Sequence, residues 1–124
     1  MTNEASIIER LRGSFPVMPT PFHDDQSLDL DGLSAVIDRV LDRGIKGLTL
    51  LGSSAEAAYL TADERTQVLR HAVQRVNGRA TLLVGVIQVG PLPAVEEAKR
   101  FRDLGEFETS SSFSAVGLSL SRTR

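Results

Sequence analysis

The sequence predicts an α/β protein in which parallel strands are covered by helices. Three short apolar segments alternate with amphipathic segments of helical length, in the order β-α-β-α-β-α. The strand segments are apolar on both faces, as expected of parallel strands that are buried between layers. This pattern leaves two architectures open, a closed barrel and a doubly wound open sheet.

The first strand and the first helix are expected in residues 14–20 and 29–43. Residues 14–20 (SFPVMPT) form a short apolar run, which Pro19 and Pro21 bring to an end. In residues 29–43, apolar side chains recur at helical spacing after an acidic start, and Gly44 supplies a stop signal. The polar residues between the two segments predict a loop.

The second strand is expected in residues 46–51 (KGLTLL), and a second helix follows it. Thr61 and Glu64 have the spacing of a capping box, in which each side chain accepts a hydrogen bond from the other residue's backbone amide. The helix is therefore expected to begin after Thr61. Asn77 and Gly78 predict its end.

The third strand, residues 81–89 (TLLVGVIQV), is the most apolar, and the helix in residues 91–105 has prolines in its first turn. Residues 106–124 are rich in serine, and their one candidate strand, AVGLSL, is not followed by a helical pattern. We therefore expect a domain in residues 1–105. The rest of the sequence is expected to be an irregular, divergent tail that is disordered or paired opportunistically.

Composition and charge narrow the possible functions. The 124 residues include no cysteine, and 14 basic residues against 16 acidic ones give a formal net charge of −2. Nucleic-acid binding is not expected, because there is no basic block and only one tyrosine. The amino terminus lacks the apolar core of a signal peptide, and no apolar run is long enough to span a membrane. We therefore expect a cytoplasmic protein without membrane contact.

Two adjacent serines, Ser53 and Ser54, follow the second strand. The carboxyl ends of parallel strands lie on one side of a sheet, and this side carries the chemistry in both candidate architectures. Serine hydroxyls and backbone amides at that place are donors for a carboxylate or a phosphate, and Gly52 would let the anion approach closely. The alternative is a turn whose serines bond their own backbone, and spacing alone favours it.

Several separated stretches resemble one protein family in order and spacing. They are PVMPTPFHDDQSLDLDGL, GIKGLTLLGSSAEAAYLTADER, TLLVGV and AVEEAKRFRDLG. Together they cover residues 13–105 and resemble the amino-terminal part of the dihydrodipicolinate synthase and N-acetylneuraminate lyase family. The resemblance implies a partial (β/α)8 TIM barrel of about three βα units. It also implies a Schiff base between a lysine and pyruvate or a related 2-oxo acid, then aldol-type addition or cleavage without a separate cofactor.

The resemblance assigns the carboxylate of the 2-oxo acid to the serine-containing turn. Ser53 and Ser54 would bind this carboxylate, and Glu56 would brace the turn. Ala55 stands where the family usually has glycine, so it would strain the turn if that position requires a positive φ. Thr20 would shape the pocket through a hydroxyl hydrogen bond, or would simply end the strand before a proline.

No catalytic residue is expected within these 124 residues. The family's Schiff-base lysine belongs to the sixth strand, and its catalytic tyrosines follow the fourth and fifth strands, beyond the region of resemblance. Lys46 precedes the second strand, and Lys99 lies on a charged helix, so both are expected to be solvated surface residues. Tyr59 is expected to pack against its surroundings. We therefore expect a truncated lyase that is inactive alone.

The remaining polar residues do not suggest a second site. His23 and His71 have no partner at ligand spacing, so a metal site is not expected. Asp24 and Asp25 are adjacent in a loop and are expected to point apart. The arginines of the second helix are expected to form a solvated face: Arg65, Arg70, Arg75 and Arg79.

Two other functions stay open. One is a non-catalytic module that binds small anions or pairs with a relative through an exposed sheet edge. The other is a doubly wound domain that binds a phosphate. The lack of a glycine-rich fingerprint after the first strand argues against it. An incomplete barrel would leave open edges through which the chain self-associates. Seven strand residues would then partly face the missing half: Phe15, Val17, Leu48, Leu50, Leu82, Val84 and Val86.

Overall fold

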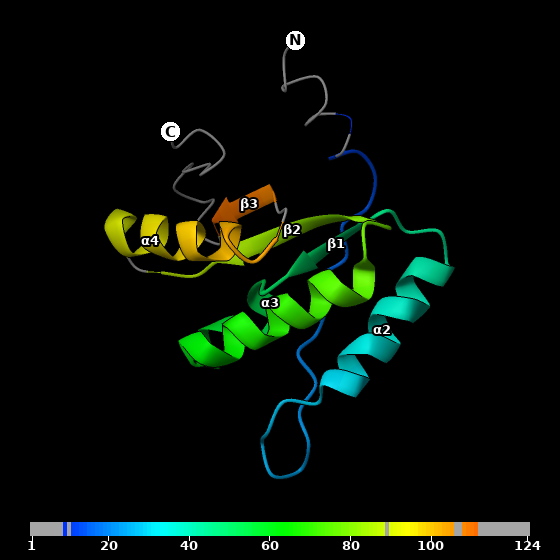
Figure 1. The fold of residues 1–124 in the computed structure, drawn as a ribbon, viewed down its shortest axis with the longest axis horizontal. Coiled ribbons are helices and arrows are strands. Elements are labelled where there is room, and N and C mark those ends of the chain that lie inside the picture. Colours follow the sequence, from blue (N-terminus) through cyan, green and yellow to red (C-terminus); the bar gives the residue numbers. More distant parts are fainter. Residues whose placement is uncertain (1–8, 10, 89, 106–107, 112–124) are drawn as a thin grey trace.

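The computed structural model describes residues 9, 11–88, 90–105 and 108–111 (Figure 1). The helices are α2 (Leu30–Asp42), α3 (Ala62–Val76) and α4 (Pro91–Arg102), and the strands are β1 (Gly47–Leu50), β2 (Thr81–Val86) and β3 (Glu108–Ser111). Two short 3-10 helices, η1 (Ser53–Ala55) and η2 (Ala57–Tyr59), lie between β1 and α3. None of the described helices is long and apolar enough to cross a membrane. The expected cytoplasmic location stays a prediction.

The strands form a parallel sheet in the order β1-β2-β3, which an amino-terminal segment extends beyond β1. In this segment Val17 forms a parallel bridge with Thr49. The Met18 amide donates to the Thr49 carbonyl at 2.8 Å, and the Thr49 amide donates to the Pro16 carbonyl at 2.9 Å. The first predicted strand is thus reduced to one bridge, because the prolines on both sides of it have no N–H to donate.

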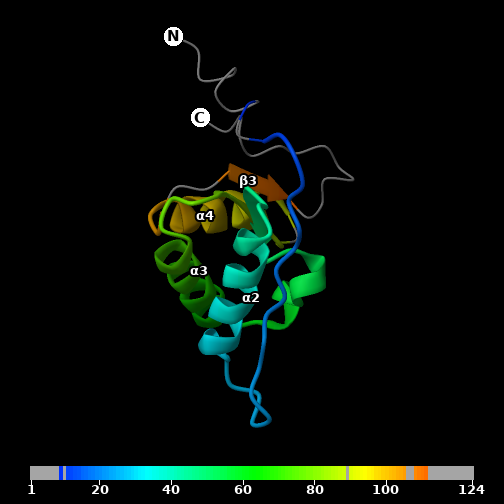
Figure 2. The same cartoon turned by 90° about the vertical axis from the view of Figure 1, so that its right-hand side faces the viewer.

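Four extended segments therefore lie side by side in the order in which the chain forms them. In the common doubly wound sheets, one of the first four strands is added on the opposite side of the sheet from the strand before it. In a barrel, each new strand is added on the same side as the last. Each connection leads to the next strand on the same side of the sheet. Right-handed connections of this kind place all three helices on one face of the sheet. Figure 2 shows these helices together on one side of the amino-terminal segment. The structure is an α/β piece with parallel strands, consistent with part of a barrel.

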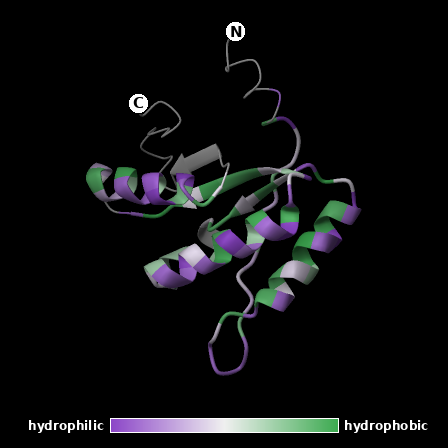
Figure 3. Ribbon diagram, viewed as in Figure 1, coloured by the Kyte–Doolittle hydropathy of each residue, from purple (hydrophilic) through white to green (hydrophobic). Residues whose placement is uncertain are grey.

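The face of the sheet that meets the helices forms the core. Figure 3 shows that β1 and β2 are largely apolar, while each helix carries hydrophilic residues as well. Five strand residues expected to face a missing half are instead buried in this core: Leu48, Leu50, Leu82, Val84 and Val86. That expectation was wrong for them because β1 and β2 turn these alternate side chains toward the helices. Phe15 and Val17 belong to the other face, where Val17 is 40% exposed.

The starts of the three helices and the end of α3 lie where local signals predicted them, whereas α4 ends at Arg102, before the predicted exit at Gly105. The Thr61 amide donates to Glu64 Oε1 at 2.9 Å, and the Glu64 amide donates to Thr61 Oγ1 at 3.0 Å, which completes the capping box. Asn77 ends α3 in the left-handed conformation with a φ of 47°. The Asp29 carboxylate caps α2 by accepting from the Gly32 amide at 2.8 Å. These ends were predictable because each capping group lies within one helical turn of its partner.

The strand β3 lies within the region that was expected to be an irregular tail. Its residues pair in parallel with β2, from Leu83 opposite Glu108 to Val86 opposite Ser111. The apolar pattern did not indicate this strand, because main-chain pairing with the edge of β2 does not require apolar residues. The predicted domain boundary after residue 105 stays a prediction, and AVGLSL lies outside the described residues.

Candidate functional site

The hydroxyl turn, residues 51–56, lies at the carboxyl end of β1, where the sequence pattern placed it. Leu51 directly follows β1 and is buried. The Ala55 amide donates to the Gly52 carbonyl at 3.0 Å and closes η1. The chain then continues through η2 into α3, so that the turn connects the buried strand β1 with an amphipathic helix.

Two residues of the hydroxyl turn that are not glycine adopt the left-handed backbone conformation. The φ angles are 57° at Leu51 and 56° at Glu56. Each such conformation costs roughly 1 kcal/mol in a residue with a Cβ atom. Ala55, where a strain was expected if φ were positive, does not have a positive φ, and it is 1% exposed. The backbone strain therefore lies on its neighbours, and Ala55 is compatible with the turn.

Ser54 is exposed, and its hydroxyl makes no hydrogen bond with any residue that the structure describes. The backbone of Ser53 belongs to η1, whereas its side chain lies outside the described part of the structure. At Ser54, the alternative of a serine that bonds its own backbone is therefore not observed. The Ser54 hydroxyl is accessible to a ligand.

Gly52 lies against the amino-terminal segment, where a side chain would be closely packed. A Cβ atom on Gly52 would lie 3.0 Å from Val17 Cγ1 and 3.7 Å from Thr49 Cγ2. The space beside Gly52 is thus occupied by the protein's own side chains. These contacts do not test the approach of an anion to the Gly52 backbone, which stays a prediction.

Thr20 lies at the same end of the sheet as the hydroxyl turn. Val17 pairs with Thr49 in parallel, so Thr20, three residues on, lies toward the carboxyl end of β1. Thr20 is 9% exposed, and its hydroxyl makes no hydrogen bond with a described residue. The pocket-shaping role predicted for Thr20 stays a prediction. A different threonine, Thr49, donates from its Oγ1 to the Phe15 carbonyl at 3.0 Å.

The lysines are solvated, as predicted, whereas the tyrosine is not packed. Lys46 is exposed at the amino end of β1, the end opposite to the hydroxyl turn, and Lys99 is exposed on α4. Tyr59 is 87% exposed, so its predicted packing role was wrong. The short 3-10 helix that contains Tyr59 turns its ring away from the core.

The histidines have partners that sequence spacing did not reveal. Ser34 Oγ and His71 Nε2 are 2.5 Å apart and join α2 to α3. His23 Nε2 lies 3.8 Å from Asp29 Oδ1. Neither pair forms part of a group of three or more potential ligands, and the described residues contain no such metal-binding group.

The acidic loop does not contain a carboxylate pair. Asp25 Oδ1 accepts hydrogen bonds from Ser27 Oγ at 2.6 Å and from the Ser27 amide at 3.0 Å. These two bonds hold the pKa of Asp25 below its ordinary value. Asp24 is exposed and makes no ion pair with a described residue. The loop is therefore a local turn and not a catalytic site.

Three of the four arginines expected on a solvated face form ion pairs. Arg75 Nε donates to Asp38 Oδ1 at 2.9 Å, while its second nitrogen contacts Oδ2 of the same carboxylate. Arg79 lies 3.7 Å from Asp38 Oδ1. Arg65 pairs with the buried Glu97 at 2.7 Å. Arg75 and Arg79 remain 47% and 49% exposed, in agreement with a solvated face. The prediction was wrong for Arg65, which is 12% exposed because its partner Glu97 comes from α4, far away in the sequence.

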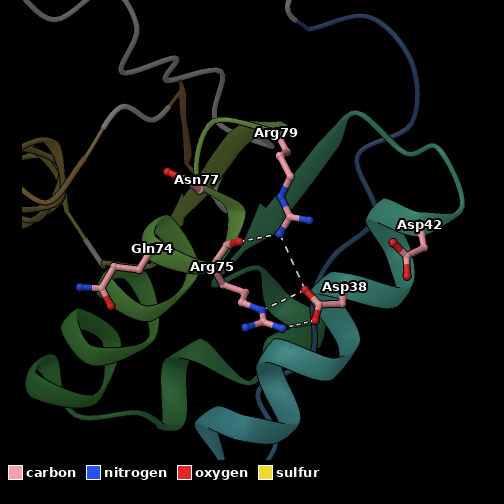
Figure 4. A pocket seen from close by; sticks show the side chains of 6 residues that line it. All are labelled: Asp38, Asp42, Gln74, Arg75, Asn77 and Arg79. Atoms are coloured by element: carbon pink, nitrogen blue, oxygen red, sulfur yellow. Dashed lines mark hydrogen bonds and ion pairs between the residues drawn. The ribbon is translucent and has the colours of Figure 1, made fainter.

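A shallow hollow of 490 Å³ lies near the carboxyl ends of α2 and α3, away from the hydroxyl turn (Figure 4). It is lined by Asp38, Asp42, Gln74, Arg75, Asn77 and Arg79. The Arg75 hydrogen bond lowers the pKa of Asp38, and the Asp38 carboxylate raises the pKa of Arg75. Because these arginines already bind Asp38, the hollow offers an anion little uncompensated charge. The hydroxyl turn stays the candidate site.

Comparisons with solved structures agree with the observed fold. A dihydrodipicolinate synthase from Oceanobacillus iheyensis matches with a TM-score of 0.76 and 27% identity, over 86% of this chain and 35% of that one. An N-acetylneuraminate lyase from Fusobacterium nucleatum matches in fold with a TM-score of 0.74 at 24% identity, over 82% of this chain and 35% of that one.

Sequence comparisons point the same way. A 4-hydroxy-tetrahydrodipicolinate synthase from Methanoculleus marisnigri is 38% identical over 95 residues, which are 75% of this chain and 33% of the relative. The enzyme of that name from Phocaeicola vulgatus is 40% identical over 77 residues, 62% of this chain and 26% of the relative. The chain thus spans about a third or less of these relatives' length. The profile of the Dihydrodipicolinate synthetase family matches residues 10–110, and the chain belongs to this family.

Proposed function

We propose that this chain supplies the first three βα units of a (β/α)8 barrel and the carboxylate-binding turn of a pyruvate-dependent lyase. Family membership and the one-directional order of four parallel segments support the barrel. The dihydrodipicolinate synthase and N-acetylneuraminate lyase relatives support aldol-type chemistry on pyruvate or a related 2-oxo acid. In this proposal the ligand's carboxylate lies at the carboxyl end of β1.

The observation that carries the proposal is the exposed hydroxyl of Ser54 in a turn of fixed shape. Leu51 and Glu56 hold this turn in a costly backbone conformation, and strained backbone is concentrated at binding sites. Ser54 and its neighbour Ser53 are the donors that we assign to the carboxylate. A hydrogen bond to a charged group contributes about 1.5–3 kcal/mol, so two of them predict a dissociation constant on the order of millimolar.

We also propose that the 124-residue polypeptide does not react with pyruvate by itself. Imine formation requires a lysine amine that is neutral and close to the substrate carbonyl. Lys46 is exposed at the opposite end of β1, and Lys99 is exposed on α4. Neither is placed for this step. Turnover then depends on residues that these 124 do not contain.

The binding site is tested by calorimetric titration of the full chain with pyruvate. Ser53→Ala and Ser54→Ala are each expected to weaken binding by about 10-fold or more, because each removes a donor to a charged group. Ser14→Ala is the matched control, since Ser14 is exposed near the amino end of the sheet. Methyl pyruvate, which lacks the carboxylate, should not bind. Equal binding of pyruvate by wild type and both serine variants would exclude the turn as the site.

The absence of imine chemistry is tested by borohydride reduction in the presence of pyruvate, followed by mass spectrometry. No covalent adduct is expected. An adduct on Lys46 or Lys99 would show that the chain is chemically competent. Phosphate binding as tight as pyruvate binding would favour the alternative of a general anion-binding module.

We further propose that the chain self-associates through the open edges of its sheet. The amino-terminal segment is joined to β1 on one side only among the described residues. Unpaired strand edges of this kind favour pairing with another chain. Val17, 40% exposed on this segment, would lie in such a contact.

A further inference from the structure

A buried ion pair joins α3 to α4 on the helical side of the sheet. Arg65 Nε donates to Glu97 Oε1 at 2.7 Å, and the exposed fractions of the two side chains are 12% and 1%. Glu97 lies on the buried stripe of α4 with Ala94 and Phe101. Within the described residues, this is the hydrogen-bonded link between α3 and α4.

The same guanidinium reaches the segment that leaves the hydroxyl turn. Arg65 donates a second hydrogen bond, from its Nη1 nitrogen to the Leu60 carbonyl at 2.7 Å. Leu60 is 5% exposed and immediately precedes Thr61, the cap of α3. One planar side chain therefore connects Glu97 with the backbone at which the turn enters the helix.

The segment between Gly52 and Leu60 consists of consecutive tight turns with little freedom to adjust. Three backbone hydrogen bonds hold it: Ala55 to Gly52 at 3.0 Å, Tyr59 to Glu56 at 2.9 Å, and Leu60 to Ala57 at 3.2 Å. Each spans three residues, as in a 3-10 helix. The second and third of these bonds enclose residues 56–60, which directly follow Ala55, so a shift of Leu60 would displace the backbone next to the turn that contains Ser54.

Net stability does not account for the ion pair. Replacing a buried ion pair by apolar side chains of similar volume is often neutral or stabilising, because desolvation offsets the attraction. Glu97 Oε2 adds to this cost, since it is buried without a hydrogen-bond partner among the described residues. A cation in the first turn of α3 is also disfavoured by the helix dipole. The pair instead fixes geometry, because the planar guanidinium holds its two acceptors, the Glu97 carboxylate and the Leu60 carbonyl, in a set orientation to each other.

We infer that Glu97, acting through Arg65 and the Leu60 carbonyl, is a positioning residue that sets the geometry of the hydroxyl turn at Ser54. The effect on a ligand rests on the carboxylate-binding role proposed above. The effect on the turn does not, and it is measured without a ligand.

The test compares wild type with the double variant Arg65→Met, Glu97→Leu, which removes both charges and keeps similar volumes. Amide hydrogen exchange at Ala55, Tyr59 and Leu60 is expected to be about 10-fold faster in the variant. Exchange at Ile37, in the core of α2, should be unchanged, and the urea midpoint should be equal or higher. Unchanged exchange in the turn, or equal acceleration at Ile37, would overturn the inference.

Arg65→Lys serves as a second variant that keeps the charge. A single ammonium has no planar fork, so it does not hold Glu97 and the Leu60 carbonyl in the same geometry. The same local acceleration of exchange is expected as in the double variant. Exchange like that of wild type would mean that charge alone suffices, which would contradict the positioning role of the guanidinium.

The ligand experiment separates this inference from the proposed function. If wild type binds pyruvate, both variants should bind it about 10-fold more weakly, since small displacements of binding groups are costly. Equal affinities would refute the effect of Glu97 on the ligand. If wild type does not bind pyruvate, the proposed function fails, while the exchange experiment still decides whether Glu97 positions the turn.

Discussion

Leu51 and Glu56 lie at the two ends of the hydroxyl turn, and both have left-handed backbone, with φ angles of 57° and 56°. Glycine adopts this conformation without a steric cost, whereas alanine does not. Glu56 is exposed, so its substitution tests the conformation without removing a buried side chain. Glu56→Gly should be more stable to urea than Glu56→Ala by about 1 kcal/mol.

Glu96→Gly and Glu96→Ala form the matched control pair, because Glu96 is exposed within α4. Here glycine should be the less stable of the two by about 1 kcal/mol. If glycine is also the less stable at position 56, the turn does not have the left-handed conformation at Glu56.

Gly52 and Val17 should show strong energetic coupling. A methyl group on Gly52 would meet Val17 Cγ1 at 3.0 Å, and β-branched Val17 has little freedom to move away. Gly52→Ala is expected to lower the free energy of unfolding by about 1–3 kcal/mol. In a Val17→Ala background the loss should shrink by at least about 0.5 kcal/mol, as measured by urea denaturation of the four proteins. Additive effects would show that the contact is relaxed at no cost.

Asp38 should make stability depend on pH in acid. Its pKa is lowered in the folded state, first by the Arg75 hydrogen bond and also by the charges of Arg75 and Arg79. A carboxylate of this kind stabilises the fold above its unfolded pKa, and this contribution is lost as the pH falls through the folded pKa. Asp38→Asn should therefore be less stable at about pH 7 and should lose less stability than wild type between about pH 5 and 3.

Urea midpoints measured across this pH range check the prediction for Asp38. Asp42→Asn is the control, because Asp42 lines the same hollow and makes no ion pair with a described residue. A wild-type pH profile that Asp38→Asn leaves unaltered would mean that the ion pair is broken in solution.

Self-association through the amino-terminal edge should depend on Val17. A charged side chain on an exposed edge strand disfavours pairing with another chain. Val17→Lys is therefore expected to lower the mean mass measured by sedimentation equilibrium, while far-ultraviolet circular dichroism remains that of wild type. Leu92→Lys is the control, because Leu92 is 76% exposed on α4 and far from this edge in sequence. An equal effect of both variants would indicate non-specific apolar association.

The helices, their caps and the side of the sheet that bears the hydroxyl turn were predictable because their signals are local. Thr61 and Glu64 lie within one helical turn of each other, and the apolar run before Ser53 marks the end of a strand. Buried partners were not predictable. Arg65 and Glu97 read as surface charges until α3 and α4 are packed, since their pairing depends on residues 32 positions apart.

The order of the elements, their parallel arrangement and the family resemblance were thus determined by the sequence itself, through hydrophobic periodicity and short-range capping. Only the tertiary structure decided that Gly52 lies against Val17, that Leu51 and Glu56 have the left-handed backbone in place of Ala55, and that Glu97 is buried. The reason is physical. Steric contact, burial and backbone strain depend on which segments pack against each other in space. Periodicity along the chain does not specify these contacts.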